Sequence, residues 1–520
     1  MNFVTYLWEH GRPDVRFLPN GAVSASVSKT DLFSQIGEMV EVLRLEGVKR
    51  GSRIVLVCGN SVLGLATLLA TIASAAIAIP IKPGKSHVDI LKLAAEVQAD
   101  YLIRLERRGM GEAVTGSAPR EMYLLEALKA RQSVACEKGG ATSWIEAIDG
   151  DVDTTIALET LSSGTTGKAK VIARTHAELS AFALRNHQLF APYLQLGSSM
   201  PKCILSTLPL AHLSGFGYSV EGILAGVDVL LLDHFDATLV LKLINDSQLA
   251  WLILLPSMYG ALITEIGRSP QSAPKALKAC VYAGEACNGS VQVEIEDCLG
   301  APALSAYGLS ECLVGIGHDL DALSHGSVAA GSCGRHMFGQ IRLVDENGVD
   351  SPAVGELLVR NETVPAALRT ASGFRMQGEW LCTGDILRRD EEGNFFYVGR
   401  CDDRFVVHGT NIYPIEIEQV ASALPGVSAV CVAPIVNRLG QNVVAMMVVA
   451  DWSGSAGFDR AALMVPSTSM PAFVMRCDAL PRLESGKVHR REVTRCLQEE
   501  YRKKFAGRVV TTATGDDDGS

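Results

Sequence analysis

Hydroxyl, glycine and lysine residues are concentrated between residues 161 and 170, where the sequence reads LSSGTTGKAK. Glycine lets backbone N–H groups approach a phosphate closely, while the hydroxyls and two lysines add donors and positive charge. This is not a Walker A loop, because no glycine lies five residues before Gly167 and Lys168 is followed by alanine. A flexible surface loop has a similar composition, so the segment alone leaves phosphate binding and a simple loop both open.

Motifs farther along the chain give this segment a context, because together they resemble the adenylate-forming superfamily of acyl-CoA synthetases, luciferases and peptide-synthetase adenylation domains. The phosphate loop of that superfamily reads roughly TSGTTGxPKG, and this chain has SSGTTGKAKV. The other matching segments are LPLAHLSG from Leu208, AGE from Ala283, YGLSE from Tyr307, CTGD from Cys382, GRCDD from Gly399, GTNIYPIEIE from Gly409 and LPRLESGK from Leu480. The resemblance covers residues 29–495 and keeps the superfamily's motif order, which a chance match would not produce.

The resemblance implies a site for ATP and Mg²⁺. Thr165, Thr166 and Lys170 would hold the β- and γ-phosphates, and Ser310 would contact the α-phosphate. Glu311 would ligate Mg²⁺ together with Thr166, since this hard cation accepts a carboxylate alongside phosphate oxygens. The residues expected to bind ATP or AMP are Ser163, Gly164, Thr165, Thr166, Gly167, Lys170, Gly284, Glu285, Tyr307, Gly308, Ser310, Asp385 and Arg400.

The adenosine part of the nucleotide has its own expected partners. Tyr307 offers a flat face for adenine, Asp385 can accept hydrogen bonds from both ribose hydroxyls, and Arg400 can support the ribose or a phosphate. Each residue also has a structural alternative. Tyr307 could be a core aromatic, Glu311 a solvated charge, and Asp385 with Arg400 a surface ion pair.

Catalysis, by the same resemblance, depends on Lys487, which lies more than 300 residues beyond the phosphate-type loop. Only a C-terminal domain folded over the site could bring this lysine to the acyl carboxylate and α-phosphate, where it would stabilise the charge of the transition state. Asp402 falls at the superfamily's hinge, and rotation there would exchange Lys487 for the Gly409 loop in the second half-reaction. Gly409 would border a CoA tunnel that a side chain would crowd. The expected catalytic residues are Lys487, His212, Glu311 and Thr166.

The residues expected to line the acyl pocket are mostly apolar, which limits the class of acid substrate. Amino-acid-activating relatives hold the α-ammonium with an aspartate near the gating-histidine motif, and residues 209–222 contain none. His212 would open or shut the acyl pocket, with a core histidine as its structural alternative. The expected pocket residues are His212, Phe216, Met258, Ala283 and Leu309. These residues favour a hydrophobic acid of the fatty, aryl or polycyclic type.

Three segments depart from the superfamily's pattern. Ala169 and Val171 replace the usual proline and glycine of the phosphate loop, which puts its stiffness and turnover in question. Leu483-Glu484 replaces Thr-Pro before the catalytic lysine. The segment 451–471 is short and rich in serine, glycine and proline, where relatives carry a longer helix, so the acceptor is less defined than the adenylation step.

Apolar runs of strand length alternate with helical patterns through residue 284, which predicts a layered α/β fold with much parallel sheet. The runs are IVLVC at 54–58, AAIAIPI at 75–81, YLIRL at 101–105, CILSTLPL at 203–210, VDVLLL at 227–232, AWLILLP at 250–256 and KACVYAG at 278–284. We expect an N-terminal AMP-binding domain over 1–400, with a β-rich subdomain over about 335–400. A small mobile α+β domain over 401–505 and a disordered tail over 506–520 complete the prediction.

Composition narrows the class of protein. The 520 residues carry a formal charge of −10, which disfavours a nucleic-acid-coating protein. Thirteen cysteines without a CxxC pair fit reduced thiols in a cytoplasmic protein, and the N-terminus lacks the features of a signal peptide. Residues 61–81 carry no charge and could span a bilayer by length, but a buried helix at 61–74 followed by a strand explains them equally well.

The function that the resemblance implies is an ATP-dependent acyl-CoA synthetase, acting as a monomer or homodimer. It would form an acyl adenylate, release pyrophosphate and pass the acyl group to CoA. The alternatives are a ligase that delivers the acyl group to a carrier protein or an amine, and a nucleotide-binding regulator without catalysis. The retention of Glu311, Asp385, Arg400 and Lys487 argues against the regulator.

Overall fold

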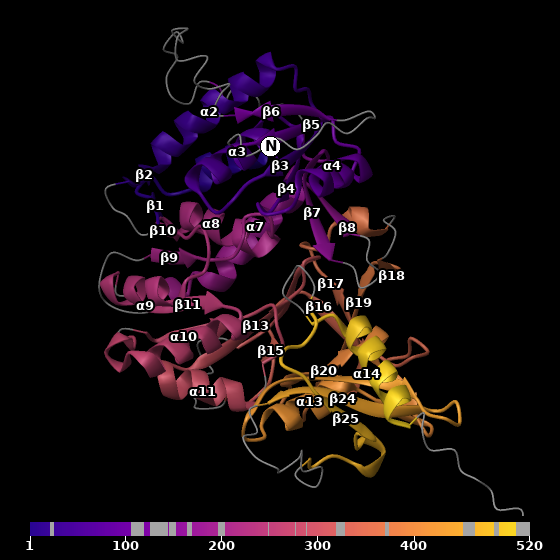
Figure 1. The fold of residues 1–520 in the computed structure, drawn as a ribbon. Coiled ribbons are helices and arrows are strands. Elements are labelled where there is room, and N and C mark those ends of the chain that lie inside the picture. Colours follow the sequence, from indigo (N-terminus) through magenta and orange to yellow (C-terminus); the bar gives the residue numbers. More distant parts are fainter. Residues whose placement is uncertain are drawn as a thin grey trace, which may run out of the picture. The chain divides into compact units, whose positions relative to one another are not determined.

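The computed structural model combines helices with parallel and antiparallel sheets, which confirms the predicted α/β class (Figure 1). It describes residues 1–20, 25–105, 119–124, 144, 152–163, 169–195, 203–247, 249–275, 277–287, 289–318, 328–369, 374–450, 463–482 and 488–505. The predictions for residues 164–167, Lys487 and the tail from 506 lie outside this part of the chain. A larger compact unit comprises 1–342, 358–383 and 389–396, and a smaller one comprises 343–357, 384–388 and 397–520. The predicted domain boundary at residue 400 stays a prediction.

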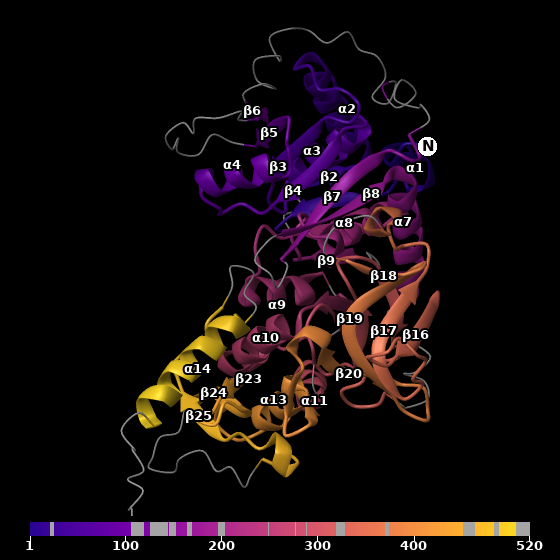
Figure 2. The ribbon, with the colours of Figure 1, turned by 90° about the vertical axis from the view of Figure 1, so that its right-hand side faces the viewer.

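The first sheet of the larger unit has the strand order β6-β5-β3-β4-β7-β8 and is parallel except for the β7–β8 pair. Its strands are β3 (Arg53–Val57), β4 (Ile77–Ile81), β5 (Tyr101–Arg104), β6 (Arg120–Tyr123), β7 (Ile156–Ser163) and β8 (Ala169–Thr175). Helices α2 (Lys29–Leu45) and α3 (Val62–Ala73) pack against each other beside it, as Figure 2 shows. Helix α4 (His87–Glu96) also accompanies this sheet. The apolar runs at 54–58, 75–81 and 101–105 therefore form strands, as predicted.

The uncharged stretch 61–81 folds as a helix and a strand. Ser61 caps α3 by accepting a hydrogen bond from the Gly64 N–H. Nearly all residues of α3 are buried. β4 pairs in parallel with β3 and β7, which places it in the interior of the sheet. No helix in the described ranges is long and apolar enough to cross a membrane. The prediction of a buried helix followed by a strand is confirmed.

Two further sheets, which combine parallel and antiparallel pairs, complete the larger unit's α/β layers. One sheet has the order β2-β1-β10-β9 and the other the order β11-β12-β13-β14-β15. Their strands are β1 (Arg16–Pro19), β2 (Val27–Ser28), β9 (Cys203–Ser206), β10 (Asp228–Leu231), β11 (Trp251–Leu254), β12 (Ala279–Tyr282), β13 (Ala303–Gly308), β14 (Leu313–Gly317) and β15 (Arg335–His336). The accompanying helices are α7 (His176–Phe190), α8 (Leu213–Ala225), α9 (Ala237–Asp246), α10 (Pro256–Arg268) and α11 (Gly289–Leu299).

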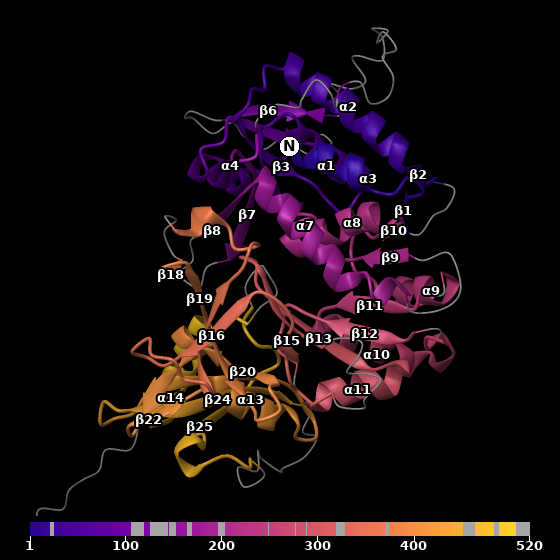
Figure 3. The ribbon, with the colours of Figure 1, turned by 180° about the vertical axis from the view of Figure 1, so that it is seen from behind.

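Helix α1 (Phe3–His10) was not predicted, although it contributes to the core of the larger unit. It packs against α3, α7 and α8, as Figure 3 shows from behind. Phe3 and Leu7 are fully buried, and the Phe3 N–H donates to Nδ1 of His176, a buried residue at the start of α7. A helix of two turns is marginal by itself, so its stability comes from these tertiary contacts.

The residues beyond 335 form the predicted β-rich segment and the α+β segment. The strands of the first are β16 (Gln340–Val344), β17 (Val354–Arg360), β18 (Arg375–Gln377), β19 (Trp380–Arg389) and β20 (Phe395–Arg400). The elements of the second are β21 (Phe405–Val407), β22 (Thr410–Ile412), α13 (Pro414–Ser422), β23 (Val427–Val436), β24 (Asn442–Ala450), β25 (Phe473–Arg476) and α14 (Arg490–Phe505). Apolar residues on the two faces of the β23-β24-β25 sheet form separate cores against α13 and α14.

Candidate nucleotide and acyl site

Three parallel strands bring several predicted site residues to one edge of a sheet. Leu254 of β11 is in register with Tyr282 of β12, which is in register with Ser305 of β13. The segments that follow these strands therefore leave from the same carboxyl edge, where open α/β sheets bind ligands. They carry Met258 after β11, Ala283, Gly284 and Glu285 after β12, and Tyr307, Gly308, Leu309, Ser310 and Glu311 at the end of β13.

The Gly284–Glu285 segment is tied to the start of helix α10. The Glu285 carboxylate accepts hydrogen bonds from the N–H and the hydroxyl of Ser257, both at 3.1 Å. A carboxylate is favoured at a helix N-terminus because the helix dipole is positive there. Met258, the next residue, is half-buried and packs against two of the unit's cores. The hydrogen bonds to Ser257 fix the Gly284–Glu285 segment relative to the start of helix α10.

The YGLSE motif forms the turn between β13 and β14. The Leu309 N–H donates to the Cys312 carbonyl at 3.2 Å. Beyond the turn, the Thr363 hydroxyl accepts from the Leu313 N–H at 3.0 Å. Arg174 on β8 donates through Nη2 to the Ser310 carbonyl at 2.9 Å and to the Glu311 carbonyl at 2.7 Å. The turn that carries the two predicted phosphate and metal residues is thus held by contacts at both sides.

Exposure differs along this turn in a way that suits its predicted roles. Ser310 is exposed and Glu311 is half-buried, and the described residues include no ion-pair partner for Glu311. Tyr307 is half-buried, so it is not a fully enclosed core aromatic. Cys312 is 0% exposed, and burial raises the pKa of its thiol to about 12, with the nearby Glu311 adding to the effect. Its sulfur is therefore a neutral thiol at physiological pH.

The phosphate-type segment connects β7 to β8. Ser162 pairs with Lys170 and Ser163 with Ala169, and residues 164–168 lie outside the described part of the chain. The ammonium group of Lys170 lies 5.2 Å from the centre of the Phe374 ring. Val171 pairs with Leu161 within the ladder, where a β-branched residue fits the extended backbone. The predicted effect of Ala169 and Val171 on turnover stays a prediction.

The LPLAH motif connects β9 to α8, and two features fix its backbone. Asn60, which the sequence analysis did not select for the site, donates to the Leu208 carbonyl and accepts from the Leu210 N–H, both at 2.7 Å. A Cβ on Gly215 would lie 2.3 Å from the Pro209 carbonyl oxygen, so glycine is required for this close packing. Asn60 was detectable only as an isolated polar residue beside an apolar run.

His212 and Phe216 lie on the same helix in different surroundings. His212 is the N-cap residue of α8 and is exposed, which excludes the alternative of a core histidine. Phe216 is 1% exposed and its ring lies 5.9 Å from that of Phe3 in the core. The prediction that Phe216 lines the acyl pocket is not supported, because its side chain packs against the unpredicted helix α1. Met258, Ala283 and Leu309 are each half-buried.

Asp385 and Arg400 meet in the smaller unit. Arg400 Nη1 donates to Asp385 Oδ1 at 2.6 Å, and the Asp385 side chain is 5% exposed. The pair is therefore not a surface ion pair. Burial raises the pKa of the neighbouring Tyr397, and the charge of Asp385 adds to that shift. The two residues predicted to bind ribose and phosphate are thus adjacent.

The predicted hinge and tunnel residues lie in turns of the smaller unit. Asp402 is exposed in a short 3-10 helix, Cys401–Asp403. Gly409 follows His408 in the turn between β21 and β22, and both have positive φ values, 80° and 48°. The described residues place no atom within 4 Å of a Cβ built on Gly409. Within this unit glycine is therefore favoured by backbone conformation rather than by crowding, and the tunnel role stays a prediction.

Lys487 lies outside the described residues, but the residues around it are held in place. Arg482 and Val488 form an isolated antiparallel bridge on either side of it. Arg490, at the start of α14, forms a two-pronged ion pair with Glu418 of α13 and lies 3.5 Å from Asp403. The start of α14 is thus anchored to α13 and to the turn that contains the predicted hinge residue.

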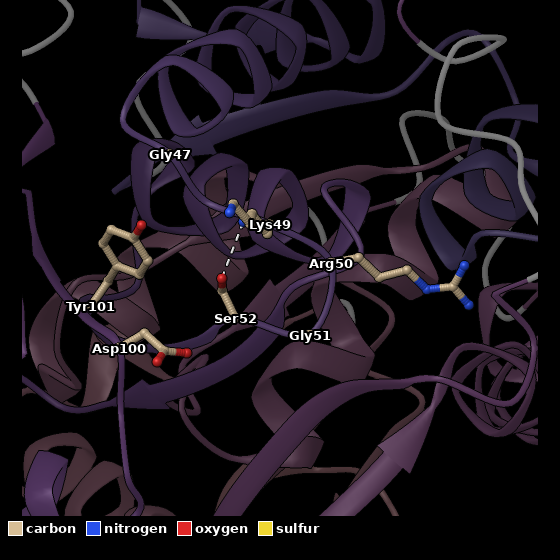
Figure 4. Close-up of a pocket in the computed structure, with 7 residues that line it drawn as sticks. All are labelled: Gly47, Lys49, Arg50, Gly51, Ser52, Asp100 and Tyr101. Atoms are coloured by element: carbon tan, nitrogen blue, oxygen red, sulfur yellow. Dashed lines mark hydrogen bonds between the residues drawn. The ribbon is translucent and has the colours of Figure 1, made fainter.

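A surface hollow elsewhere in the larger unit contains none of the predicted site residues (Figure 4). It lies where the chain enters β3 and β5, at the edge opposite to their carboxyl ends. Its lining residues are Gly47, Lys49, Arg50, Gly51, Ser52, Asp100 and Tyr101. Figure 4 shows the hydrogen bond from the Lys49 N–H to the Ser52 hydroxyl that closes the loop before β3.

The layered sheets, the hairpin around the phosphate-type segment and the YGLSE turn define a nucleotide-binding class of enzyme. The chain belongs to the family of AMP-binding enzymes, whose sequence model matches residues 10–366. This confirms the resemblance to the adenylate-forming superfamily. The matched region ends before Asp385, so the smaller unit is assigned through its own motifs and through likeness of fold.

Named relatives extend this family assignment. A 2-succinylbenzoate–CoA ligase of Bacillus cereus is 26% identical over 355 residues, covering 65% of this chain and 69% of that protein. A fatty acid–[acyl-carrier-protein] ligase of Streptomyces coeruleorubidus is 30% identical over 363 residues, covering 66% and 67%. Both alignments cover about two thirds of each chain.

Solved structures share the fold over nearly the whole chain. ATP-bound MatB from Rhodopseudomonas palustris has a TM-score of 0.79 at 21% identity and covers 96% of this chain and 99% of its own. The o-succinylbenzoate CoA synthetase of Bacillus subtilis, in complex with its acyl-adenylate intermediate, has a TM-score of 0.77 at 22% identity, covering 95% and 97%. These likenesses establish the fold, with a large N-terminal part and a smaller C-terminal part.

Proposed function

We propose that this protein activates a hydrophobic carboxylic acid with ATP and transfers the acyl group to CoA. In the first step a carboxylate oxygen attacks the α-phosphorus, the bond to the β-phosphate oxygen breaks, and pyrophosphate leaves. In the second step the CoA sulfur attacks the acyl carbon, its thiol proton is lost, and AMP leaves. The observation that carries the proposal is the grouping of Glu285, Tyr307, Ser310 and Glu311 at one sheet edge of an AMP-binding enzyme.

Phosphate and metal binding follow from charge and exposure. Lys170, Thr165 and Thr166 bind the β- and γ-phosphates, and Ser310 contacts the α-phosphate. The described residues contain no group of three or more histidine, cysteine, aspartate or glutamate side chains that could hold a metal ion. The proposed Mg²⁺ therefore takes Glu311 from the protein, with Thr166, and its other ligands from phosphate oxygens and water. When bound, it would neutralise charge on the phosphates.

Adenosine recognition is assigned to residues of the matching motifs. Tyr307 stacks on adenine beside Gly284, and Asp385 accepts hydrogen bonds from the ribose hydroxyls while Arg400 orients its carboxylate. The 2.6 Å contact between Arg400 and Asp385 supports this, because the guanidinium fixes the orientation of the carboxylate. Lys487 acts on the substrate carboxylate and α-phosphate during adenylation, and rotation at Asp402 then exchanges it for the Gly409 loop in the second half-reaction.

The apolar, half-buried residues at the sheet edge favour a hydrophobic acid as the substrate. Met258, Ala283 and Leu309 offer contact surface without charge, and His212 is exposed at the start of α8. A hydrophobic acid gains from such contacts, whereas an acid with an ammonium group would need a carboxylate there. The relatives named for 2-succinylbenzoate and fatty acids support an aryl or fatty acid.

A carrier-protein thiol is the second candidate acceptor. It is favoured by the relative that is 30% identical and is named for ligation of fatty acids to an acyl-carrier protein. Both acceptors present the same reacting sulfur, so the first half-reaction is common to both. Transfer to an amine is the third outcome. No disulfide is found among the twelve cysteines of the described residues, which supports the proposed cytoplasmic location.

The experiment measures pyrophosphate release from Mg-ATP with a panel of fatty, aryl and polycyclic acids, with and without CoA. Mass spectrometry identifies the acyl product. We expect acid-dependent release that rises with CoA and yields an acyl-CoA. Adenylate formation that ignores CoA would move the acceptor to a carrier protein or an amine. ATP binding without acid-dependent pyrophosphate release would refute the synthetase and support the regulator.

A further inference from the structure

Arg174 is a fully buried arginine for which the proposed reaction has no assigned role. It lies on β8, on the same face as Lys170 and Ile172, because side chains alternate along a strand. Its relative exposure is 1%, and it is among the largest fully buried side chains of the described residues. An apolar residue would build the same strand without burying a charge, so the guanidinium requires an explanation.

The contacts of Arg174 are directed at the backbone of the YGLSE turn. Nη2 donates to the carbonyls of Ser310 and Glu311, at 2.9 and 2.7 Å, and Nη1 lies 3.5 Å from the Thr160 hydroxyl. In the described part of the chain the guanidinium has no ion pair, and its Nε has no hydrogen-bond partner. Burial lowers the pKa of Arg174 to about 10, so the group remains a cation at physiological pH.

We propose that Arg174 is a positioning residue for adenylation, which holds the Ser310 and Glu311 backbone so that their side chains meet the α-phosphate and Mg²⁺. This inference rests on the proposed function. The two carbonyls accept hydrogen bonds from the buried guanidinium, while Ser310 is exposed and Glu311 is half-buried. One guanidinium can donate to both carbonyls at once because its N–H groups form a rigid fork.

Arg174 also joins two parts of the site that are distant in sequence. Lys170, four residues earlier on β8, lies about 13 Å away along the strand at ~3.3 Å per residue. The strand that follows the phosphate-type segment is thereby attached directly to the turn that carries the proposed metal residue. Displacement of one would alter the distance between the γ-phosphate side and the Mg²⁺ side of the nucleotide. Loss of Arg174 should therefore raise the Mg²⁺ concentration that the reaction needs. Binding of the acid substrate should be unaffected.

The test compares wild type with Arg174→Gln and Arg174→Lys, and with Arg185→Met as the control. Arg185 is a partly exposed arginine of α7, paired with Glu362 and stacked on Phe338, in the same unit. The dissociation constant of ATP is measured by calorimetry in the presence of Mg²⁺ and in the presence of EDTA. The Mg²⁺ concentration for half-maximal pyrophosphate release is measured in parallel. Thermal unfolding of each variant fixes a temperature at which all are folded.

We expect Arg174→Gln to need about 10- to 100-fold more Mg²⁺, the usual cost of losing a residue that orients a metal ligand. Arg174→Lys should recover part of this, and Arg185→Met should match wild type. A lower unfolding temperature with an unchanged ratio of the two ATP dissociation constants would overturn the inference, since Arg174 would then be only structural. Wild type that binds Mg-ATP but releases no pyrophosphate would refute the proposed function, while the binding ratio would still test Arg174.

Discussion

His176 should make the stability of the larger unit depend on pH. This histidine is 0% exposed and its Nδ1 accepts the Phe3 N–H at 3.1 Å, which attaches helix α1 to α7. Its Nε2 is buried without a hydrogen-bond partner. Burial lowers the pKa of His176 to about 4, and the positive N-terminus adds to the effect. The folded chain therefore holds this residue neutral.

The sign and size of the effect follow from linkage. Because the folded-state pKa lies below the unfolded value of about 6.5, protons bind preferentially to the unfolded chain. The stability is fully present above pH 6.5 and is lost as the pH falls towards 4. A pKa difference of about 2.5, at 1.36 kcal/mol per pKa unit, amounts to about 3 kcal/mol.

His176→Asn removes the titrating ring while its side-chain oxygen can still accept the Phe3 N–H. Urea unfolding, followed by tryptophan fluorescence at several pH values between 7 and 4, gives the free energy of unfolding for wild type and variant. The difference between the two should change by about 3 kcal/mol over this range, because other titrating groups cancel. His10→Asn, an exposed histidine in α1, controls for the substitution itself. Parallel pH profiles for wild type and His176→Asn would refute the reasoning.

Three further variants test the site and its scaffold. Lys487→Ala should lower acyl-adenylate formation by about 100-fold or more, with ATP binding retained, as measured by pyrophosphate release and calorimetry. Gly409→Leu should spare adenylation and block thioester formation, as measured by separate assays of pyrophosphate and acyl-CoA. His187→Ala should lower the free energy of unfolding by about 3–5 kcal/mol, measured in urea, because it strands the fully buried Glu221 carboxylate whose Oε1 lies 2.8 Å from the imidazole.

Matched controls separate these effects from misfolding. Gly409→Asn tolerates a positive φ, so it should keep wild-type adenylation, and equal loss of both half-reactions in Gly409→Leu would contradict the tunnel role. Adenylation by Lys487→Ala within a fewfold of wild type would remove that lysine from the mechanism. His187→Ala combined with Glu221→Gln should recover stability, since the neutral amide is less costly to bury. A double variant as unstable as the single one would show that the buried charge is not the cause.

Strand and helix positions in the larger unit were largely predictable, because apolar runs of four to eight residues fix which segments are buried. The run at 75–81 became β4, and the run at 251–254 became β11. Helix α1 was missed because two turns carry little periodic signal and its stability depends on α3, α7 and α8. Helix α13 begins at Pro414, since proline is well suited to the first helical position.

The site was predictable wherever a motif carries the chemistry, and less so where tertiary packing decides the role of a residue. Gly284, Glu285 and the YGLSE turn do meet at one sheet edge, as the parallel order of their strands requires. Phe216 was expected in a pocket, but which side of α8 faces the core depends on Phe3, more than 200 residues away. Arg174 could be noticed only as a second charge in the strand after Lys170, and its two carbonyl partners were not deducible from spacing.

The burial of Cys312 affects how readily the enzyme's own thiol can be acylated. An acyl adenylate is a strong electrophile, and a thiolate beside it would be acylated in place of the proper acceptor. Cys312 directly follows Glu311, yet its side chain is enclosed and burial raises the pKa of its thiol to about 12. The thiol therefore stays protonated and out of contact with the activated acid. An enclosed, protonated thiol at this position is a poor nucleophile for an activated acid.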